Sequence, residues 1–134
     1  MKEQFLILLA LVLMAIPISS YGQKTTRVKF AKGATKAVAT GNLNGYKSKS
    51  VVFVIRVKAG QTLRVEQLIL SKNTHYITFR ITNPSGKNAT DGEANCNNRK
   101  TVENTSAGDY RIGVTECAKA DEWRGSFKIK FTVR

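Results

Sequence analysis

An alternation of apolar and polar side chains with a period of two most restricts what this 134-residue chain can fold into. It is clearest at residues 127–134, where Phe, Ile, Phe and Val alternate with Lys, Lys, Thr and Arg. Successive side chains of a β-strand point to opposite faces, so such a segment buries one face and exposes the other. The pattern recurs at residues 63–65, 77–82 and 110–114. Residues 51–57 are more continuously apolar, which is typical of a strand covered on both faces.

Clusters of turn-forming residues, each with a glycine that can adopt positive φ, separate these segments. They lie at residues 42–45, 58–61, 83–86 and 106–109. No helical period is found after residue 22. About eight short strands at this spacing predict an all-β, antiparallel β-sandwich, with a closed barrel as the competing arrangement. The aromatic residues predicted to fill the space between the two sheets are Phe53, Phe79, Phe127 and Phe131.

The amino terminus has the pattern of a secretory signal peptide. Lys2 precedes an apolar run at residues 5–16, and small side chains precede a predicted cleavage after Gly22. A helix of this run is about 18 Å long, shorter than the roughly 30 Å hydrocarbon core, so no membrane anchor is expected. A buried amino-terminal strand is the alternative. We therefore predict a signal peptide at residues 1–22 and one domain at residues 23–134, located in the periplasm or secreted.

Cys96 and Cys117 are the two cysteines of the chain. An even count in an exported chain favours one disulfide over a metal site. The bridge closes a loop of about twenty residues, which the chain-entropy model values at roughly 3 kcal/mol. Residues 87–100 lack strand periodicity and are rich in Asn, so they are predicted to form a long loop held at its far end by Cys96.

No set of catalytic residues is found in the sequence. His75 is the only histidine and has no nucleophile motif nearby, which favours a structural role. There is no phosphate-binding loop and no paired-histidine zinc motif. Asp91 and Glu93 lack the full run of oxygen ligands of a calcium loop, and Asp121 and Glu122 are interpreted as solvated charges. The chain is therefore predicted to be a binding protein that needs no metal or cofactor.

Four short motifs follow one another along the predicted domain. They are Val-Lys-Phe-Ala-Lys-Gly at 28–33, Gly-Asn-Leu-Asn-Gly-Tyr at 41–46, Lys-Ala-Gly-Gln at 58–61 and Ala-Gly-Asp-Tyr at 107–110. In this order, over residues 27–134, the chain resembles the bacterial periplasmic inhibitors of g-type lysozyme. The last two motifs are also similar to the pre-peptidase carboxy-terminal β-sandwich domains of secreted hydrolases. Because no enzyme accompanies the domain in this chain, the inhibitor is favoured.

The resemblance implies a β-sandwich that inserts loops from one end into the substrate cleft of a g-type lysozyme. Tyr46 matches a family contact position, and residues 116–125 correspond to the segment where the family uses arginines. A Ser-Gly-x-Tyr turn of related inhibitors is altered here, since Ala107 stands at the position of the serine. The contacts that the resemblance implies are Tyr46, Ser106, Lys119, Trp123 and Arg124.

A second hypothesis follows from the formal charge of +13. Such a charge attracts anionic surfaces over long range. Lys128, Lys130 and Arg134 share one face of the last predicted strand and would form a basic stripe. The alternative to the inhibitor is therefore a cationic binding module, of the pre-peptidase type, for an acidic polysaccharide or another polyanion. Steep salt dependence would mark this module, whereas an inhibitor should select one type of lysozyme.

Overall fold

The structure, a computed structural model, describes residues 25–44, 51–69, 76–90, 98–117 and 124–134. Several predictions fall outside these ranges, namely those on residues 1–22 and on Tyr46, His75, Asp91, Glu93, Cys96, Lys119, Asp121, Glu122 and Trp123. The described residues form eight strands and no helix. Accordingly, this part of the chain contains no helix with the length and apolar character needed to cross a membrane.

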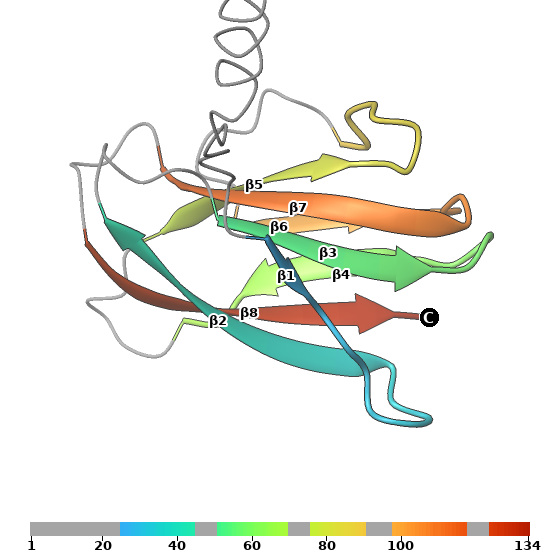
Figure 1. The fold of residues 1–134 in the computed structure, drawn as a ribbon, viewed down its shortest axis with the longest axis horizontal. Helices are drawn as coiled ribbons and strands as arrows, with labels where there is room; N and C mark the ends of the chain where they lie inside the picture. Colours follow the sequence, from blue (N-terminus) through green and yellow to red (C-terminus); the bar gives the residue numbers. More distant parts are fainter. Residues whose placement is uncertain (1–24, 45–50, 70–75, 91–97, 118–123) are drawn as a thin grey trace, which may run out of the picture.

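The eight strands form two four-stranded sheets that pack against each other (Figure 1). One sheet has the order β1-β3-β7-β5 and the other the order β2-β8-β4-β6. The strands are β1 (Thr25–Arg27), β2 (Lys36–Asn44), β3 (Val51–Val57), β4 (Leu63–Gln67), β5 (Ile77–Thr82), β6 (Arg99–Val102), β7 (Gly108–Glu116) and β8 (Arg124–Val133). The predicted all-β fold with about eight strands is confirmed, and the two open sheets are a sandwich rather than a barrel.

One strand pair departs from the predicted antiparallel arrangement. β1 runs parallel to β3, with Thr25 opposite Val52. Because β2 lies in the other sheet, the chain reverses direction twice between β1 and β3, and the two strands point the same way. The short edge strand is also held by Arg27, which donates two hydrogen bonds of 2.8 and 3.0 Å to Asp109 of β7.

Two predicted boundaries are wrong. The turn expected at residues 42–45 begins too early, because β2 continues to Asn44 and places Leu43, 4% exposed, in the core. The loop expected at residues 87–100 ends too late, because Arg99 already pairs with Glu66 of β4. β6 is an edge strand held by backbone pairing, so its polar sequence shows little of the apolar alternation that marks the other strands.

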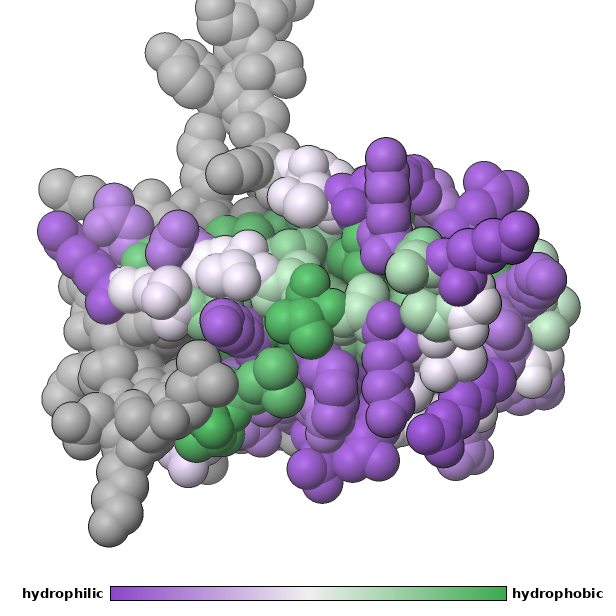
Figure 2. All heavy atoms as spheres, turned by 90° about the horizontal axis from the view of Figure 1, so that it is seen from below, coloured by the Kyte–Doolittle hydropathy of each residue, from purple (hydrophilic) through white to green (hydrophobic). Residues whose placement is uncertain are grey.

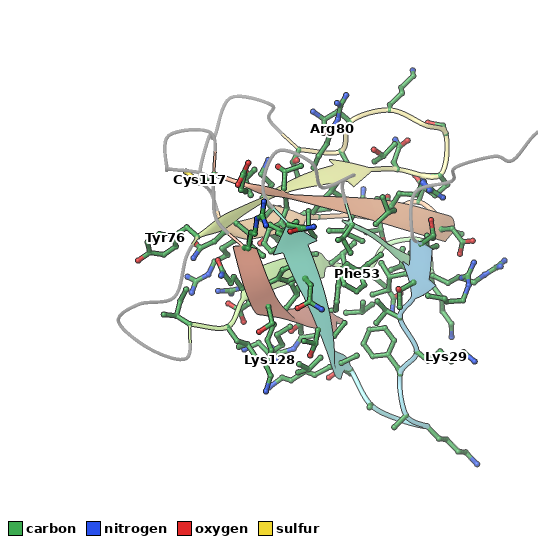
Figure 3. The ribbon with its side chains drawn as sticks, turned by 60° about the vertical axis from the view of Figure 1, so that its left-hand side comes forward. Lys29, Phe53, Tyr76, Arg80, Cys117 and Lys128 are labelled. Atoms are coloured by element: carbon green, nitrogen blue, oxygen red, sulfur yellow. The ribbon has the colours of Figure 1, made fainter. Side chains whose placement is uncertain are left out.

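The core between the two sheets is mostly aliphatic, and an aromatic cluster within it joins the sheets. All four phenylalanines predicted to lie inside, Phe53, Phe79, Phe127 and Phe131, are buried. The ring of Phe53 on β3 meets Phe127 of β8 edge to face, with centroids 6.3 Å apart. It also meets Phe131 of β8 at 5.7 Å. Phe53 therefore provides the ring contacts of the first sheet with the two phenylalanines of β8 (Figure 3).

A glycine of β2 makes room for this cluster. Gly41 lies opposite Phe127, and a Cβ at this position would lie within 2.4 Å of the Phe127 ring. The ring therefore rests on the backbone of β2, in the place where any other residue has a side chain. Since Phe127 also contacts Phe53, a side chain at position 41 would displace a ring that joins the two sheets.

Candidate functional site

Residues 45–50 and 118–123 contain most of the predicted contacts. The strand ends that flank them meet at one end of the sandwich, on the left in Figure 1. β2 ends at Asn44, opposite Arg124, where β8 begins. β3 likewise begins beside the last residues of β7. Residues 45–50 join β2 to β3, and residues 118–123 join β7 to β8. Both segments therefore leave the sandwich at this end, which we call the connection end.

Of the predicted contacts, Arg124 is described at the connection end, where it is exposed. Tyr46, Lys119 and Trp123 lie outside the described residues, within the two segments that leave there. Ser106 precedes β7 and lies at the opposite end of the sandwich, roughly 26 Å away along that strand. Its backbone N–H donates to the hydroxyl of Tyr110 at 3.1 Å. The structure does not bring Ser106 together with Arg124.

Two exposed apolar side chains at this end were missed by the sequence analysis. Tyr76, just before β5, is 54% exposed, and its carbonyl accepts a hydrogen bond from the N–H of Cys117 at 3.3 Å. Figure 3 shows Tyr76 pointing away from the sandwich at this end. Ile69, which follows β4, is 48% exposed. The alternation of β5 could have found Tyr76, because Ile77 faces the core and its neighbour must then face out.

Cys117 follows the last residue of β7 and is 5% exposed. It therefore lies at the root of the segment that carries Lys119 and Trp123. Its expected partner, Cys96, lies outside the described residues, so the disulfide stays a prediction.

A second feature is the basic outer face of the β2-β8-β4-β6 sheet. The predicted arrangement of β8 is confirmed: Lys128, Lys130 and Arg134 turn outward, while the alternating residues Ile129, Phe131 and Val133 are buried. Figure 2, in which the molecule is seen from the side of β2 and β8, shows many hydrophilic side chains gathered over these strands. The sequence analysis missed that cations of neighbouring strands extend this stripe.

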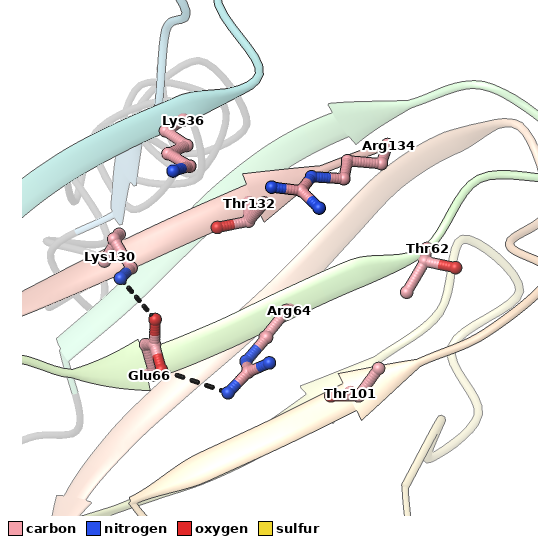
Figure 4. A pocket seen from close by; sticks show the side chains of 8 residues that line it. All are labelled: Lys36, Thr62, Arg64, Glu66, Thr101, Lys130, Thr132 and Arg134. Carbon is pink, nitrogen blue, oxygen red and sulfur yellow. Dashed lines mark ion pairs between the residues drawn. The ribbon is translucent and has the colours of Figure 1, made fainter.

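These side chains line a hollow of about 420 Å³ on the outer face, which we call the sheet-face groove (Figure 4). Its lining comes from all four strands of the sheet and their ends: Lys36, Thr62, Arg64, Glu66, Thr101, Lys130, Thr132 and Arg134. Four of these side chains are cations and one is a carboxylate. Within the part of the chain that the structure describes, no group of three or more His, Cys, Asp or Glu side chains could hold a metal ion.

Glu66 is the carboxylate of the groove, and it forms ion pairs with three neighbouring cations. It forms ion pairs with Lys130, with Arg99 Nε at 3.2 Å and with Arg64 Nη2 at 3.5 Å. The hydrogen bond from Lys130 is the main cause that lowers the pKa of Glu66 below its ordinary value. Desolvation of the side chain, which is 13% exposed, opposes this shift, and the positive charges of the three partners add to it.

We expect Glu66→Gln to lower the free energy of unfolding by about 1–2 kcal/mol at pH 7, because three cations lose their shared carboxylate. A lowered folded-state pKa contributes stability that is complete above the ordinary value of 4.5 and is lost as the pH falls through the folded-state value. The difference between wild type and variant should therefore vanish in acid. Urea denaturation between pH 7 and pH 3 measures it, with the exposed Glu103→Gln as the matched control. A difference that is unchanged at pH 3 would contradict the assignment.

Solved structures with this β-sandwich architecture include periplasmic lysozyme inhibitors and a pre-peptidase domain. The chain is similar to Aeromonas hydrophila PliG, a periplasmic inhibitor of g-type lysozyme, with 25% identity and a TM-score of 0.61. That match covers 83% of this chain and 96% of the other. Salmonella Typhimurium PliG, also an inhibitor of g-type lysozyme, is 16% identical with a TM-score of 0.59, covering 84% and 100%.

The pre-peptidase C-terminal domain of a Bacillus anthracis collagenase is 16% identical, with a TM-score of 0.51, and the match covers 87% of this chain and 100% of that domain. No protein-family model and no curated protein sequence matches the chain. The resemblance to both kinds of domain that the four motifs indicated is thus confirmed at the level of the fold.

Proposed function

We propose that the chain is an inhibitor of g-type lysozyme that inserts the segments of its connection end into the substrate cleft. The observation that carries this proposal is the register that pairs Asn44, the residue before 45–50, with Arg124, the residue after 118–123. The similarity to Aeromonas hydrophila PliG, which extends over almost the whole of that protein, supports it. Both PliG proteins are described as inhibitors of an enzyme, which is consistent with a chain that is not itself an enzyme.

The chemistry of the connection end fits an acidic cleft. Glycoside hydrolases place a pair of carboxyl groups at the scissile bond. Arg124 is exposed and can donate charge-assisted hydrogen bonds to a carboxylate, and Lys119 would add a second cation. Tyr76 offers exposed aromatic surface, to which Tyr46 and Trp123 would add, and buried aromatic side chains are the usual anchors of protein interfaces. At physiological salt the Debye length is about 8 Å, so the net charge of +13 is largely screened at longer range, whereas close charge pairs in a cleft are screened much less.

The test is a titration of purified g-, c- and i-type lysozymes with residues 23–134 at physiological salt. The proposal expects a stoichiometric loss of g-type activity and much weaker effects on the other two types. Undiminished g-type activity at a molar excess of the chain would overturn it. The export that the proposal requires is tested by the amino-terminal sequence of the protein purified from periplasm, which should start at Gln23.

Single substitutions at the connection end should separate contacts from charge. We expect Tyr46→Ala and Arg124→Ala each to raise the inhibition constant by about 10- to 100-fold, because each removes an anchor or a charge-assisted hydrogen bond. Lys32→Ala removes the same charge as Arg124→Ala but in the exposed turn before β2, at the opposite end, and should change the constant by less than about 2-fold. Equal effects of the two charge removals would speak against docking through the connection end.

Ser106→Ala tests whether the end of the sandwich opposite the connection end also contacts the lysozyme. Because Ser106 lies roughly 26 Å from Arg124, a loss of inhibition here as well would require a second contact region. Its hydrogen bond to Tyr110 uses the backbone N–H, so the substitution leaves that bond in place.

A further inference from the structure

The sheet-face groove contains a row of four residues that the strand register aligns across the sheet. Lys36 of β2 lies opposite Thr132 of β8, Thr132 lies opposite Arg64 of β4, and Arg64 lies opposite Thr101 of β6. Neighbouring strands are about 4.8 Å apart, so the backbones of Lys36 and Arg64 are separated by roughly 10 Å, with the Thr132 hydroxyl between them. We call these four residues the threonine row.

The neighbouring row differs in charge. It contains Lys130, Glu66 and Arg99, and there the carboxylate of Glu66 pairs with both cations. The threonine row has no carboxylate of its own. The guanidinium of Arg64 reaches Glu66 only at 3.5 Å, and its Nε is buried without a hydrogen-bond partner among the described residues. The Arg64 side chain as a whole is 43% exposed, so the rest of its guanidinium has donors that this single long ion pair does not use.

A third cation completes the surroundings of Thr132. Arg134 follows it by two residues on β8, about 7 Å along the same face. Its backbone is fixed beside the groove by two hydrogen bonds with Thr62, of 2.7 and 3.2 Å. Figure 4 shows Lys36 and Arg134 on either side of Thr132, and Arg64 on the next strand with its guanidinium directed toward Glu66.

We infer that the sheet-face groove binds a sulfate or phosphate monoester group of an anionic glycan, with Lys36, Arg64 and Arg134 as cationic ligands and Thr132 as a neutral donor. A tetrahedral monoester has three terminal oxygens, one for each cation, and the exposed Arg64 guanidinium, held to Glu66 by an ion pair of 3.5 Å, can turn toward one of them. The site is separate from the connection end, because Lys36 is the first residue of β2 and that strand ends at the connection end.

The geometry favours this ligand over two other polyanions. A carboxylate has two oxygens, so two of the three cations would have to share one of them. A phosphodiester has only two terminal oxygens, and single-stranded nucleic acids are usually held by aromatic side chains that stack on the bases. No aromatic residue lines the groove as the structure describes it. A glycan that carries monoesters is therefore the occupant to which the charges and the shape point.

The test is the binding of residues 23–134 to a size-defined heparin octasaccharide, measured by calorimetry at several salt concentrations. Arg64→Ala should weaken binding by about 10-fold and reduce the slope of log K against log salt by about one. Arg64→Lys keeps the charge but loses the planar fork and should weaken binding by about 3-fold. Inorganic sulfate and inorganic phosphate, compared with chloride at equal ionic strength, should both compete, and the stronger competitor identifies the preferred ester.

Arg80→Ala is the matched control, because it removes the same charge from an exposed position on the outer face of the other sheet. It should change binding by less than about 2-fold. Equal losses for Arg64→Ala and Arg80→Ala would show that only net charge matters, and would overturn the inference. Equal binding of desulfated heparin or of oligo-dT would overturn it as well. Inhibition of g-type lysozyme should be unchanged in Arg64→Ala, so the two proposals fail or stand separately.

Discussion

Phe53→Ala is expected to lower the free energy of unfolding by about 3–5 kcal/mol, the range observed when a buried phenylalanine is truncated. Phe53 is 1% exposed and contacts Phe127 and Phe131 of the opposite sheet. Its removal leaves a cavity between the sheets and takes away two aromatic contacts at once. The Phe127 ring rests on the backbone of β2 at Gly41, where no side chain is displaced, so moving into the space would cost it this packing.

Urea denaturation followed by tryptophan fluorescence and circular dichroism measures this loss. If the whole fold of this domain depends on the aromatic cluster, many molecules of the variant will be unfolded at 37 °C, since native domains are stable by only about 5–15 kcal/mol. Tyr76→Ala removes an aromatic ring from an exposed position and should change the stability by less than about 0.5 kcal/mol. A loss below about 1 kcal/mol for Phe53→Ala would show that the sheets are held together elsewhere.

The core was predictable because the signal for it is local. A residue of a strand faces the same side as the residue two positions away, so the alternation at residues 127–134 states directly which side chains are buried. Phe79, Phe127 and Phe131 were found in this way, whereas Phe53 belongs to the more continuously apolar residues 51–57. The same reasoning applied to β5 would have predicted that Tyr76 is exposed. The errors in the predicted strand boundaries lie in segments that are strands because of backbone pairing with a neighbouring strand, and not because of alternating apolar side chains.

The misplaced boundaries and the parallel pair depend on contacts between distant parts of the chain. Arg99 is in a strand because Glu66 lies beside it, and no pattern within residues 87–100 reveals this neighbour. β1 is parallel to β3 because β2 crosses to the other sheet, and a sequence does not state to which sheet a strand belongs. Both facts are properties of the topology and follow only from the assembled fold.

The same difference between local and distant contacts decides which parts of the basic face could be predicted from the sequence. The basic stripe of β8 was visible in the sequence, because Lys128, Lys130 and Arg134 are spaced by even numbers of residues. The groove was not visible, because Lys36 and Arg64 come from strands that meet only through β8. In the structure Lys130 forms an ion pair with Glu66. Its charge is therefore less available to a ligand than the basic stripe in the sequence alone suggests.

Replacing both Cys96 and Cys117 with alanine is expected to lower the free energy of unfolding by about 3 kcal/mol and to weaken inhibition of g-type lysozyme. The stability loss follows from the release of a loop of about twenty residues in the unfolded chain. The loss of inhibition has a separate cause. Cys117 is the buried residue from which the segment with Lys119 and Trp123 starts, and a segment held less firmly must be ordered at a greater entropic cost on binding.

Reductant separates a disulfide from two buried thiols. Oxidised wild type should show no reactive thiol after denaturation, and dithiothreitol should lower its stability to that of the double variant, which itself should not respond. Two titratable thiols in the denatured, oxidised protein would refute the bridge. If the bridge is present but the double variant inhibits as well as wild type at a temperature where both are folded, the segment after Cys117 does not depend on it. The inhibitor proposal would then rest on Tyr46 and on Arg124, which the pairing of β8 with β2 already holds at the connection end.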